Sequence, residues 1–244
     1  MLLALVQTNR GASYFEVREV LSSISADVVL LPENWNAEIT REEELLRFFS
    51  TLPKFPIVVP GAFYVKDGDK IKSRSYILRD GEVLDYCEKI FPSYAVGEAE
   101  RISPGNKLCA AQYGWLKIGV LICVDLLFPE LARFYALRGV NLLLNPANIS
   151  RDRIPLWRSL ALARAFENHM YVAFANNVGG TYADGRTVSG GSVVATPNGY
   201  ILLEMDERAG FALARLVEDE VEYARTRRRY VDLASRFSSS SLRL

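Results

Sequence analysis

The 244-residue sequence predicts an α/β fold, a four-layer α-β-β-α sandwich in which two mixed β-sheets are stacked and flanked by helices. Strand–helix units occur at both ends of the chain, and β-meanders lie between them. The long strands are apolar on successive residues, as expected where both faces of a sheet are covered. No linker divides the chain, which predicts a single domain over residues 1–244, with a polar C-terminal tail from about residue 231 that includes Ser238–Ser241.

The N-terminal part contains two strand–helix units. Apolar runs and helical spacing predict a strand, a helix and a second strand at Leu2–Gln7, Tyr14–Ile24 and Asp27–Leu31. A second helix is predicted at Thr40–Leu52. Thr40 is its expected N-cap, and Glu43, three residues later, would complete a capping box.

The middle of the chain changes to strands joined by tight turns, and helices return after residue 128. Asp80-Gly81 is typical of a hairpin turn. The strands predicted in the middle are Pro56–Val65, Ser73–Arg79, Glu82–Ile90, Leu108–Gln112 and Trp115–Cys123. The later elements are predicted at Pro129–Arg138 (helix), Val140–Asn145, Pro155–Asn168 (helix), Tyr171–Asn177, Ser192–Thr196, Tyr200–Met205, Phe211–Val217 and Asp219–Arg227 (helix).

Composition restricts the possible partners and compartment. The formal net charge is zero, and the one basic cluster, Arg225–Arg229, is interpreted as a solvated or subunit-contacting face, so no nucleic-acid partner is expected. No apolar run is long enough to cross a bilayer, and the first residues lack the features of a signal peptide. The three cysteines, Cys87, Cys109 and Cys123, form no CxxC pair, which favours neither a disulfide framework nor a zinc site. We therefore expect a cytoplasmic protein without a membrane partner.

The single histidine, His169, excludes a metal site with several histidine ligands. It lies between a predicted helix and a predicted strand and is interpreted as a surface or junction residue. A metal-dependent phosphodiesterase or nuclease would need several ligands around a divalent ion. Asn145, Asn148, Asp125 and Asp152 are available, but one histidine is too few for the usual arrangement. No metal and no organic cofactor are expected.

Cys123 is the candidate nucleophile. It follows the apolar run Ile118–Ile122, and Phe128-Pro129-Glu130 then opens a predicted helix with proline near its first position. A cysteine on a sharp turn between strand and helix can present its sulfur to a pocket and direct backbone N–H groups at the group it attacks. The alternative interpretation is a small buried apolar residue, which is what most free cysteines are.

Two further candidates also follow predicted strands. Glu33 lies in LPENW, where partial desolvation would raise the pKa of a carboxyl group towards the range of a general base. Lys89 lies in YCEKIFP at a strand end. Taken alone, Glu33 could be a loop cap and Lys89 a surface lysine. With Cys123 at the same sheet edge they would supply a base, a cation and a thiol without a histidine.

Six ordered segments resemble the carbon–nitrogen hydrolase (nitrilase) superfamily. They are LALVQ, LPENW, YCEKIFP, GVLICVDLLFPEL, ARAFENHMYVAFANNVG and GGSVVATPNG. The resemblance implies the four-layer sandwich, with Glu33 as general base, Lys89 as oxyanion stabiliser and Cys123 as nucleophile. It also implies a second, supporting glutamate in EAERISPG, which is Glu98, with Glu100 as the alternative.

The resemblance implies hydrolysis of a small-molecule amide through a thioester on Cys123. Lys89 and the backbone N–H of Val124 would hold the oxyanion. Cys123-Val124-Asp125 is more similar to the amidase and carbamoylase branches than to nitrilases, which usually carry C-W-E. Val124 replaces an aromatic residue and Leu127 an arginine that are usual in the family, so specificity is not transferred from any one branch.

Three aromatic residues, Trp35, Tyr94 and Phe91, are candidates for the wall of a substrate pocket, and core packing is the alternative for each. The resemblance further implies a homodimer or higher homo-oligomer, with the helices Pro129–Arg138 and Pro155–Asn168 packed across a two-fold axis. Nitrile hydrolysis by the same three residues and a catalytically silent binding protein remain the alternative functions.

Overall fold

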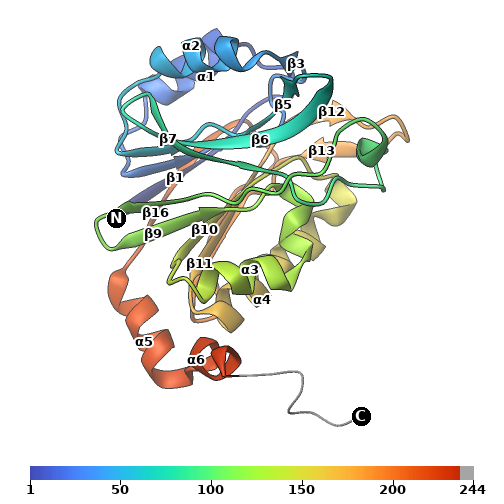
Figure 1. The fold of residues 1–244 in the computed structure, drawn as a ribbon. Coiled ribbons are helices and arrows are strands. Elements are labelled where there is room, and N and C mark those ends of the chain that lie inside the picture. Colours follow the sequence, from blue (N-terminus) through green and yellow to red (C-terminus); the bar gives the residue numbers. More distant parts are fainter. Residues whose placement is uncertain (237–244) are drawn as a thin grey trace.

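The computed structural model describes residues 1–236, and the chain folds into two stacked β-sheets with helices on both outer faces (Figure 1). The first sheet contains β1 (Leu2–Gln7), β2 (Val28–Leu30), β3 (Ile39–Thr40), β4 (Ile57–Val59), β5 (Ala62–Asp67), β6 (Lys70–Arg79), β7 (Glu82–Glu88) and β16 (Gly210–Arg215). The second contains β8 (Ala110–Tyr113), β9 (Leu116–Val120), β10 (Leu142–Ala147), β11 (Tyr171–Asn176), β14 (Val193–Ala195) and β15 (Ile201–Glu204). The predicted four-layer α-β-β-α class is confirmed.

Both sheets are mixed, as predicted. The first has the order β16-β1-β2-β4-β6-β5-β3, with β7 paired to β6, and its central strands β1, β2 and β4 are parallel. The second has the order β15-β14-β11-β10-β9-β8, with β9, β10 and β11 parallel. Functional sites in α/β folds form at the carboxyl ends of parallel strands.

Four helices form the outer layers. On the first sheet lie α1 (Tyr14–Ser22) and α2 (Glu42–Ser50), and on the second lie α3 (Pro129–Ala136) and α4 (Ile154–Asn168) (Figure 1). Two helices, α5 (Glu218–Arg228) and α6 (Tyr230–Ser235), follow the last strand. The capping box of the N-terminal part is at α1, where Ser13 Oγ accepts from the Glu16 N–H and Glu16 accepts from the Ser13 N–H.

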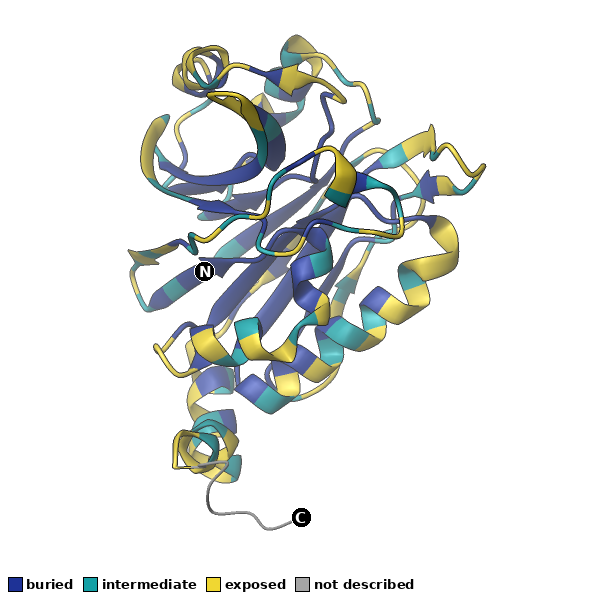
Figure 2. Ribbon diagram, turned by 45° about the vertical axis from the view of Figure 1, so that its right-hand side comes forward, coloured by how far each residue is buried: buried dark blue, intermediate teal, exposed yellow. Residues whose placement is uncertain are grey.

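The central strands of the first sheet are apolar on both faces because each face contacts a different core. In β1, Leu3 and Leu5 belong to the core shared with the second sheet, whereas Ala4 and Val6 pack in a second core with α1 and α2. Figure 2 shows the strands of both sheets as mostly buried and the outer faces of the helices as exposed. Continuous apolar runs therefore identified these strands correctly.

Two local predictions were wrong. Thr40 does not cap α2, which begins at Glu42 after Arg41; Thr40 lies in β3, and its Oγ1 accepts from Asn36 Nδ2 at 3.1 Å. The predicted strand Pro56–Val65 is two strands, β4 and β5, separated at Pro60-Gly61. Gly61 has φ 111°, and a Cβ there would lie 2.2 Å from the Pro32 carbonyl oxygen, so the close approach requires glycine.

Two segments differ from the sequence prediction in kind. A separate two-stranded ribbon, β12 (Val178–Thr181) and β13 (Thr187–Ser189), was not predicted. The first residues of the polar tail predicted from about residue 231 are helical, because they belong to α6. The remainder, including Ser238–Ser241, lies outside the described residues. Within residues 1–236, no helix combines the length and apolar character needed to cross a membrane.

Candidate active site

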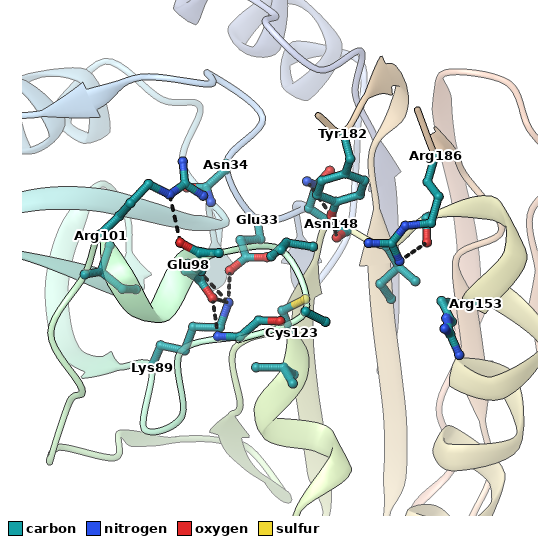
Figure 3. Close-up of a pocket in the computed structure, with 18 of the residues that line it drawn as sticks. Glu33, Asn34, Lys89, Glu98, Arg101, Cys123, Asn148, Arg153, Tyr182 and Arg186 are labelled. Carbon is teal, nitrogen blue, oxygen red and sulfur yellow. Dashed lines mark hydrogen bonds and ion pairs between the residues drawn. The ribbon is translucent and has the colours of Figure 1, made fainter. Parts of the chain in front are cut away.

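One cavity of about 900 Å³ brings the predicted site residues together (Figure 3). Glu33, Lys89, Glu98 and Cys123 all line it, and so does Val124. Glu33 follows β2, Lys89 follows β7 and Cys123 follows β9, so the carboxyl ends of strands from both sheets meet at this cavity. The expectation that these side chains converge at a sheet edge agrees with the structure.

Glu33 is held by both sheets. Its N–H donates to the carbonyl of Ala147 at the end of β10, with an N···O distance of 3.1 Å. Its carbonyl accepts from Asn177 Nδ2 at 2.6 Å, and an isolated bridge joins it to Ala62. These backbone bonds fix the position from which the Glu33 carboxylate enters the cavity.

Lys89 lies between two carboxylates. Its Nζ is 2.8 Å from Glu33 Oε1, 2.7 Å from Glu98 Oε2 and 2.9 Å from Glu98 Oε1. The side chains of Lys89, Glu33 and Glu98 expose only 2%, 4% and 2% of their surface respectively. Buried charges of this kind persist only when they are paired and hydrogen-bonded, which is the case here.

Glu98, and not the exposed Glu100, completes this cluster. Its Oε2 accepts from the Ser93 N–H at 2.8 Å, and its Oε1 accepts from the Tyr64 hydroxyl at 2.9 Å. Burial by itself raises the pKa of Glu98, but the Lys89 ammonium and the surrounding donors outweigh it, and the pKa lies below its usual value.

The pKa of Glu33 is shifted the other way. Burial raises it, Lys89 offsets only part of the effect, and the charge of Glu98 raises it further. Burial would lower the pKa of Lys89, but the charges of Glu33 and Glu98 prevail and raise it well above the usual value. Lys89 is therefore an ammonium ion, and Glu33 is the group of the cluster best suited to exchange a proton.

Cys123 occupies a strained turn. Its φ is 45°, in the left-handed region that side chains other than glycine rarely adopt, and it begins the short 3-10 helix η2 (Cys123–Leu127). Asn145 Nδ2 supports this turn by donating to the carbonyls of Leu121 at 2.6 Å and Cys123 at 3.1 Å. Burial and the Glu33 carboxylate raise the pKa of the Cys123 thiol well above its usual value, against the opposing effects of Lys89 and of the backbone at Asn148.

Asp125 connects the cysteine turn to the lysine strand. Its carboxylate accepts from the N–H groups of Ile90 at 3.0 Å and Phe91 at 2.9 Å, directly after Lys89. Asp125 exposes only 1% of its surface, and burial raises the pKa of its carboxyl group to about 7 although both N–H donors lower it. Sequence analysis treated Asp125 as a possible metal ligand and as part of the Cys123-Val124-Asp125 comparison, and it missed this role because the pairing spans 35 residues.

The three predicted wall aromatics lie elsewhere. Trp35 is fully buried against Tyr14, Phe48 and Phe63 in the core beneath α1 and α2, and its Nε1 donates to the Pro60 carbonyl at 2.7 Å. Tyr94 is 89% exposed and does not line the cavity.

Phe91 also lies outside the cavity lining and stacks on Phe128 at a centroid distance of 3.9 Å. The rings of Trp35 and Phe91 therefore pack on other aromatic rings, and the ring of Tyr94 is exposed to solvent. Trp35 and Tyr94, predicted to bind substrate, are therefore not among the residues that line the cavity of Glu33, Lys89 and Cys123.

His169 caps the C-terminus of α4 with φ 52° and does not line the cavity. It is a junction residue as predicted, but it is buried, and burial together with nearby arginines lowers its pKa to about 4. In the part of the chain that the structure describes, no group of three or more His, Cys, Asp or Glu side chains could hold a metal ion.

The opposite wall of the cavity contains Tyr182 and Arg186, which the sequence analysis did not single out, and Asn148, which it considered only as a metal ligand. Tyr182 and Arg186 lie on the loop between β12 and β13, and Asn148 follows β10 (Figure 3). Asn148 Nδ2 donates to the Tyr182 hydroxyl at 3.0 Å, and Asn148 Oδ1 accepts from Asn177 Nδ2 at 3.0 Å. These bonds join the ribbon to the Glu33 backbone through Asn177.

Comparison with known proteins agrees with this fold and site. A sequence model described as carbon-nitrogen hydrolase matches residues 16–226. An omega-amidase of Saccharomyces cerevisiae is 29% identical over 89% of this chain and 84% of its own length, and a 2-oxoglutaramate amidase of Bacillus subtilis is 27% identical over 85% and 83%. The crystal structure of yeast Nit3, a nitrilase-superfamily member, superimposes with a TM-score of 0.80 at 28% identity, covering 99% of this chain and 97% of that one.

The family match and the amidase relatives identify a hydrolase of carbon–nitrogen bonds other than peptide bonds. The chain belongs to the carbon–nitrogen hydrolase family of the nitrilase superfamily, and it is amidase-like. The predicted homo-oligomer, with the helices at Pro129–Arg138 and Pro155–Asn168 across a two-fold axis, stays a prediction, as does the cytoplasmic location.

Proposed function

We propose that the protein hydrolyses a small amide to a carboxylic acid and ammonia or an amine, with Cys123 as nucleophile, Glu33 as general base and Lys89 as oxyanion stabiliser. One observation carries the proposal: Cys123, on a turn with φ 45°, shares a cavity with a buried cluster in which Lys89 lies 2.8 Å from Glu33. Amidase names among the relatives favour amides as the substrate class.

Acylation begins from a neutral thiol, because burial and Glu33 raise the pKa of Cys123. Glu33 accepts the thiol proton as sulfur attacks the carbonyl carbon, and the new S–C bond leaves a tetrahedral oxyanion. The Lys89 ammonium and the Val124 N–H hold this oxygen, and each such donor typically lowers the barrier by about 3 kcal/mol. Glu33 then returns the proton to the leaving nitrogen as the C–N bond breaks.

Deacylation uses the same groups. Glu33 accepts a proton from a water molecule, the hydroxide attacks the thioester, and the oxyanion again lies at Lys89 and Val124. Collapse breaks the C–S bond, returns the proton to the Cys123 sulfur and releases the acid. Glu98 maintains the Lys89 ammonium through contacts of 2.7 and 2.9 Å, and Asp125 holds the backbone after Lys89.

Ammonia release from short amides, carbamoyl amino acids and nitriles tests the proposal. Wild type should release ammonia from amides, Cys123→Ala should not, and Cys109→Ala, which removes a buried cysteine outside the cavity, should retain release. Circular dichroism melts establish that both variants fold. Release that persists in Cys123→Ala would refute the nucleophile.

The same panel separates the alternative functions. Release from nitriles alone would assign nitrile hydrolysis to the same residues. No release from any compound, together with a Cys123 thiol that is inert to an alkylating reagent, would indicate a binding protein.

A further inference from the structure

Asn177 is a polar side chain in the region where the two sheets meet beside the cavity. It follows β11 directly, is fully buried and does not line the cavity. A substrate held at Cys123 is therefore out of its reach. A buried amide is tolerated in a protein interior when its hydrogen bonds are satisfied, so the partners of Asn177 indicate what it does.

The amide of Asn177 bonds three segments that follow strands of both sheets. Its Nδ2 donates to the Glu33 carbonyl at 2.6 Å and to Asn148 Oδ1 at 3.0 Å, so both of its N–H groups are used. Its Oδ1 accepts from the Thr8 hydroxyl at 3.1 Å. Thr8 and Glu33 follow strands of the first sheet, and Asn148 follows β10 of the second. One amide group therefore ties the two sheets together at this point.

Two of these partners are also neighbours of the Cys123 thiol. Besides burial, the Glu33 carboxylate raises the pKa of this thiol, and a hydrogen bond from the Asn148 backbone lowers it. Glu33 is carried by the first sheet, whereas Cys123 and Asn148 are carried by the second. The position of the carboxylate relative to the sulfur thus depends on how the two sheets are joined here, and Asn177 joins them.

The peptide bond that Asn177 contacts leads into a strained turn. Asn34, directly after Glu33, has φ 49°, in the left-handed region. Its N–H donates to the Ala62 carbonyl at 2.7 Å. The Glu33–Asn34 peptide is therefore held at its carbonyl by Asn177 and at its N–H by Ala62. Without the bond to the carbonyl, relief of the strain would rotate this peptide and move the Glu33 side chain with it.

We infer that Asn177 is a positioning residue for the base: it keeps the Glu33 carboxylate of the first sheet aligned with the Cys123 sulfur of the second. This inference rests on the proposed function, in which Glu33 accepts the proton of Cys123. Because Asn177 acts through Glu33 and has no contact with substrate, its loss slows the chemical step and leaves substrate binding almost unchanged.

A matched pair of substitutions separates positioning from stability. Asn177→Leu removes the amide at similar volume, and kcat for the preferred amide should fall by roughly 10- to 100-fold while KM changes by less than about 3-fold. Asn141→Leu is the control. The amide of Asn141 is also buried and outside the cavity lining, and it bonds the Lys117 N–H and the Trp115 carbonyl, each at 2.8 Å.

Both variants lose buried hydrogen bonds, so both should melt at a temperature lower by roughly 2–8 °C. Only Asn177→Leu should lose kcat. Equal kcat values in the two variants would show that Asn177 stabilises the fold without positioning the base, and would overturn the inference.

Alkylation of Cys123 by iodoacetamide measures the base without any amide substrate. Sulfur attacks the reagent carbon, the C–I bond breaks, iodide leaves and Glu33 accepts the thiol proton. Intact-mass spectrometry follows the adduct, with Cys123→Ala as the blank for the other cysteines. Asn177→Leu should slow alkylation by roughly 10-fold, but by less than about 3-fold when Glu33→Gln is also present. Slowing that is equal in the two backgrounds would overturn the inference.

Thr8→Val provides the milder variant if Asn177→Leu does not fold. It keeps the shape of the side chain and removes only the hydroxyl that donates to Asn177 Oδ1. It should lower kcat and the alkylation rate by roughly 3- to 10-fold, and wild-type rates in Thr8→Val would count against the inference.

The two proposals fail in different ways. Absent Cys123-dependent ammonia release would refute the proposed function. Alkylation that is slowed by Asn177→Leu only when Glu33 is present would still support the positioning role in that case. Alkylation that is independent of Asn177 would refute the positioning role whether or not amides are hydrolysed.

Discussion

Lys89 Nζ lies 2.8 Å from Glu33 Oε1, and neither side chain exposes more than 4% of its surface. With Glu98 on its other side, the ammonium balances two carboxylates that are out of contact with bulk water. The charge of Lys89 therefore supports the fold as well as the chemistry proposed for it.

Removing the ammonium leaves the two carboxylates facing one another in a buried site. We expect Lys89→Met to lose about 3–5 kcal/mol of unfolding free energy at about pH 8. Without the lysine, Glu33 and Glu98 lose the cation that lowers both pKa values. Burial and the repulsion between the two carboxylates then outweigh the Ser93 and Tyr64 donors at Glu98, and both folded-state pKa values rise above the unfolded ones. Stability is then retained at low pH and lost as the pH rises through those values.

Urea unfolding of Lys89→Met at about pH 5 and about pH 8 measures this dependence. Lys66→Met, on the exposed part of β5, is the control and should stay within about 0.5 kcal/mol of wild type at both values. A deficit that is equal at the two pH values would contradict the charge-balance account.

Glu98 tunes the base. Its charge raises the pKa of Glu33, so Glu98→Gln should move the acid limb of the kcat/KM profile to lower pH. The exposed neighbour gives a matched control, because Glu100→Gln should leave the limb in place. An acid limb that stays in place or moves to higher pH in Glu98→Gln would mean that the limb does not report the ionisation of Glu33.

The backbone at Cys123 predicts an order of stability between two inactive variants. A left-handed φ costs an ordinary residue about 1–2 kcal/mol, and glycine avoids most of this cost. Cys123→Gly should therefore be more stable than Cys123→Ala by about 1 kcal/mol, measured by thermal melting. At Cys109, which has no positive φ, the order should reverse; the same order at both positions would argue against strain.

Asp125 is expected to position Lys89 relative to Cys123. In Asp125→Asn, one of the N–H groups of Ile90 and Phe91 loses its acceptor. The resulting displacement should lower kcat by roughly 10- to 100-fold with a smaller change in KM. Asp125→Glu should recover part of kcat; a change in KM alone would indicate a role in binding.

The sequence predicted much of the fold and the centre of the site because those features depend on local pattern. Apolar runs on successive residues identified strands such as Leu2–Gln7, whose two faces contact different cores. The site residues Glu33, Lys89 and Cys123 each lie within three residues of the end of a strand, and the sheet topology brings these strand ends to one cavity.

The errors arose where distant contacts decide the outcome. Trp35 follows a strand end like Glu33, but nothing local shows that its ring enters the core beside Phe63. Thr40 had the spacing of a cap, but it lies in β3 and its hydroxyl oxygen accepts a hydrogen bond from Asn36. The loop with Tyr182 and Arg186 has neither strand nor helix periodicity, so only the folded chain reveals that it faces Cys123.

The central claim is a covalent bond to Cys123, and intact-mass spectrometry of the enzyme quenched in acid during turnover of a short amide tests it most directly. The account predicts a mass increase equal to the acyl group, located on the peptide that contains Cys123 and absent in Cys123→Ala. Turnover with steady ammonia release in Cys123→Ala, or an adduct on a different residue, would contradict it.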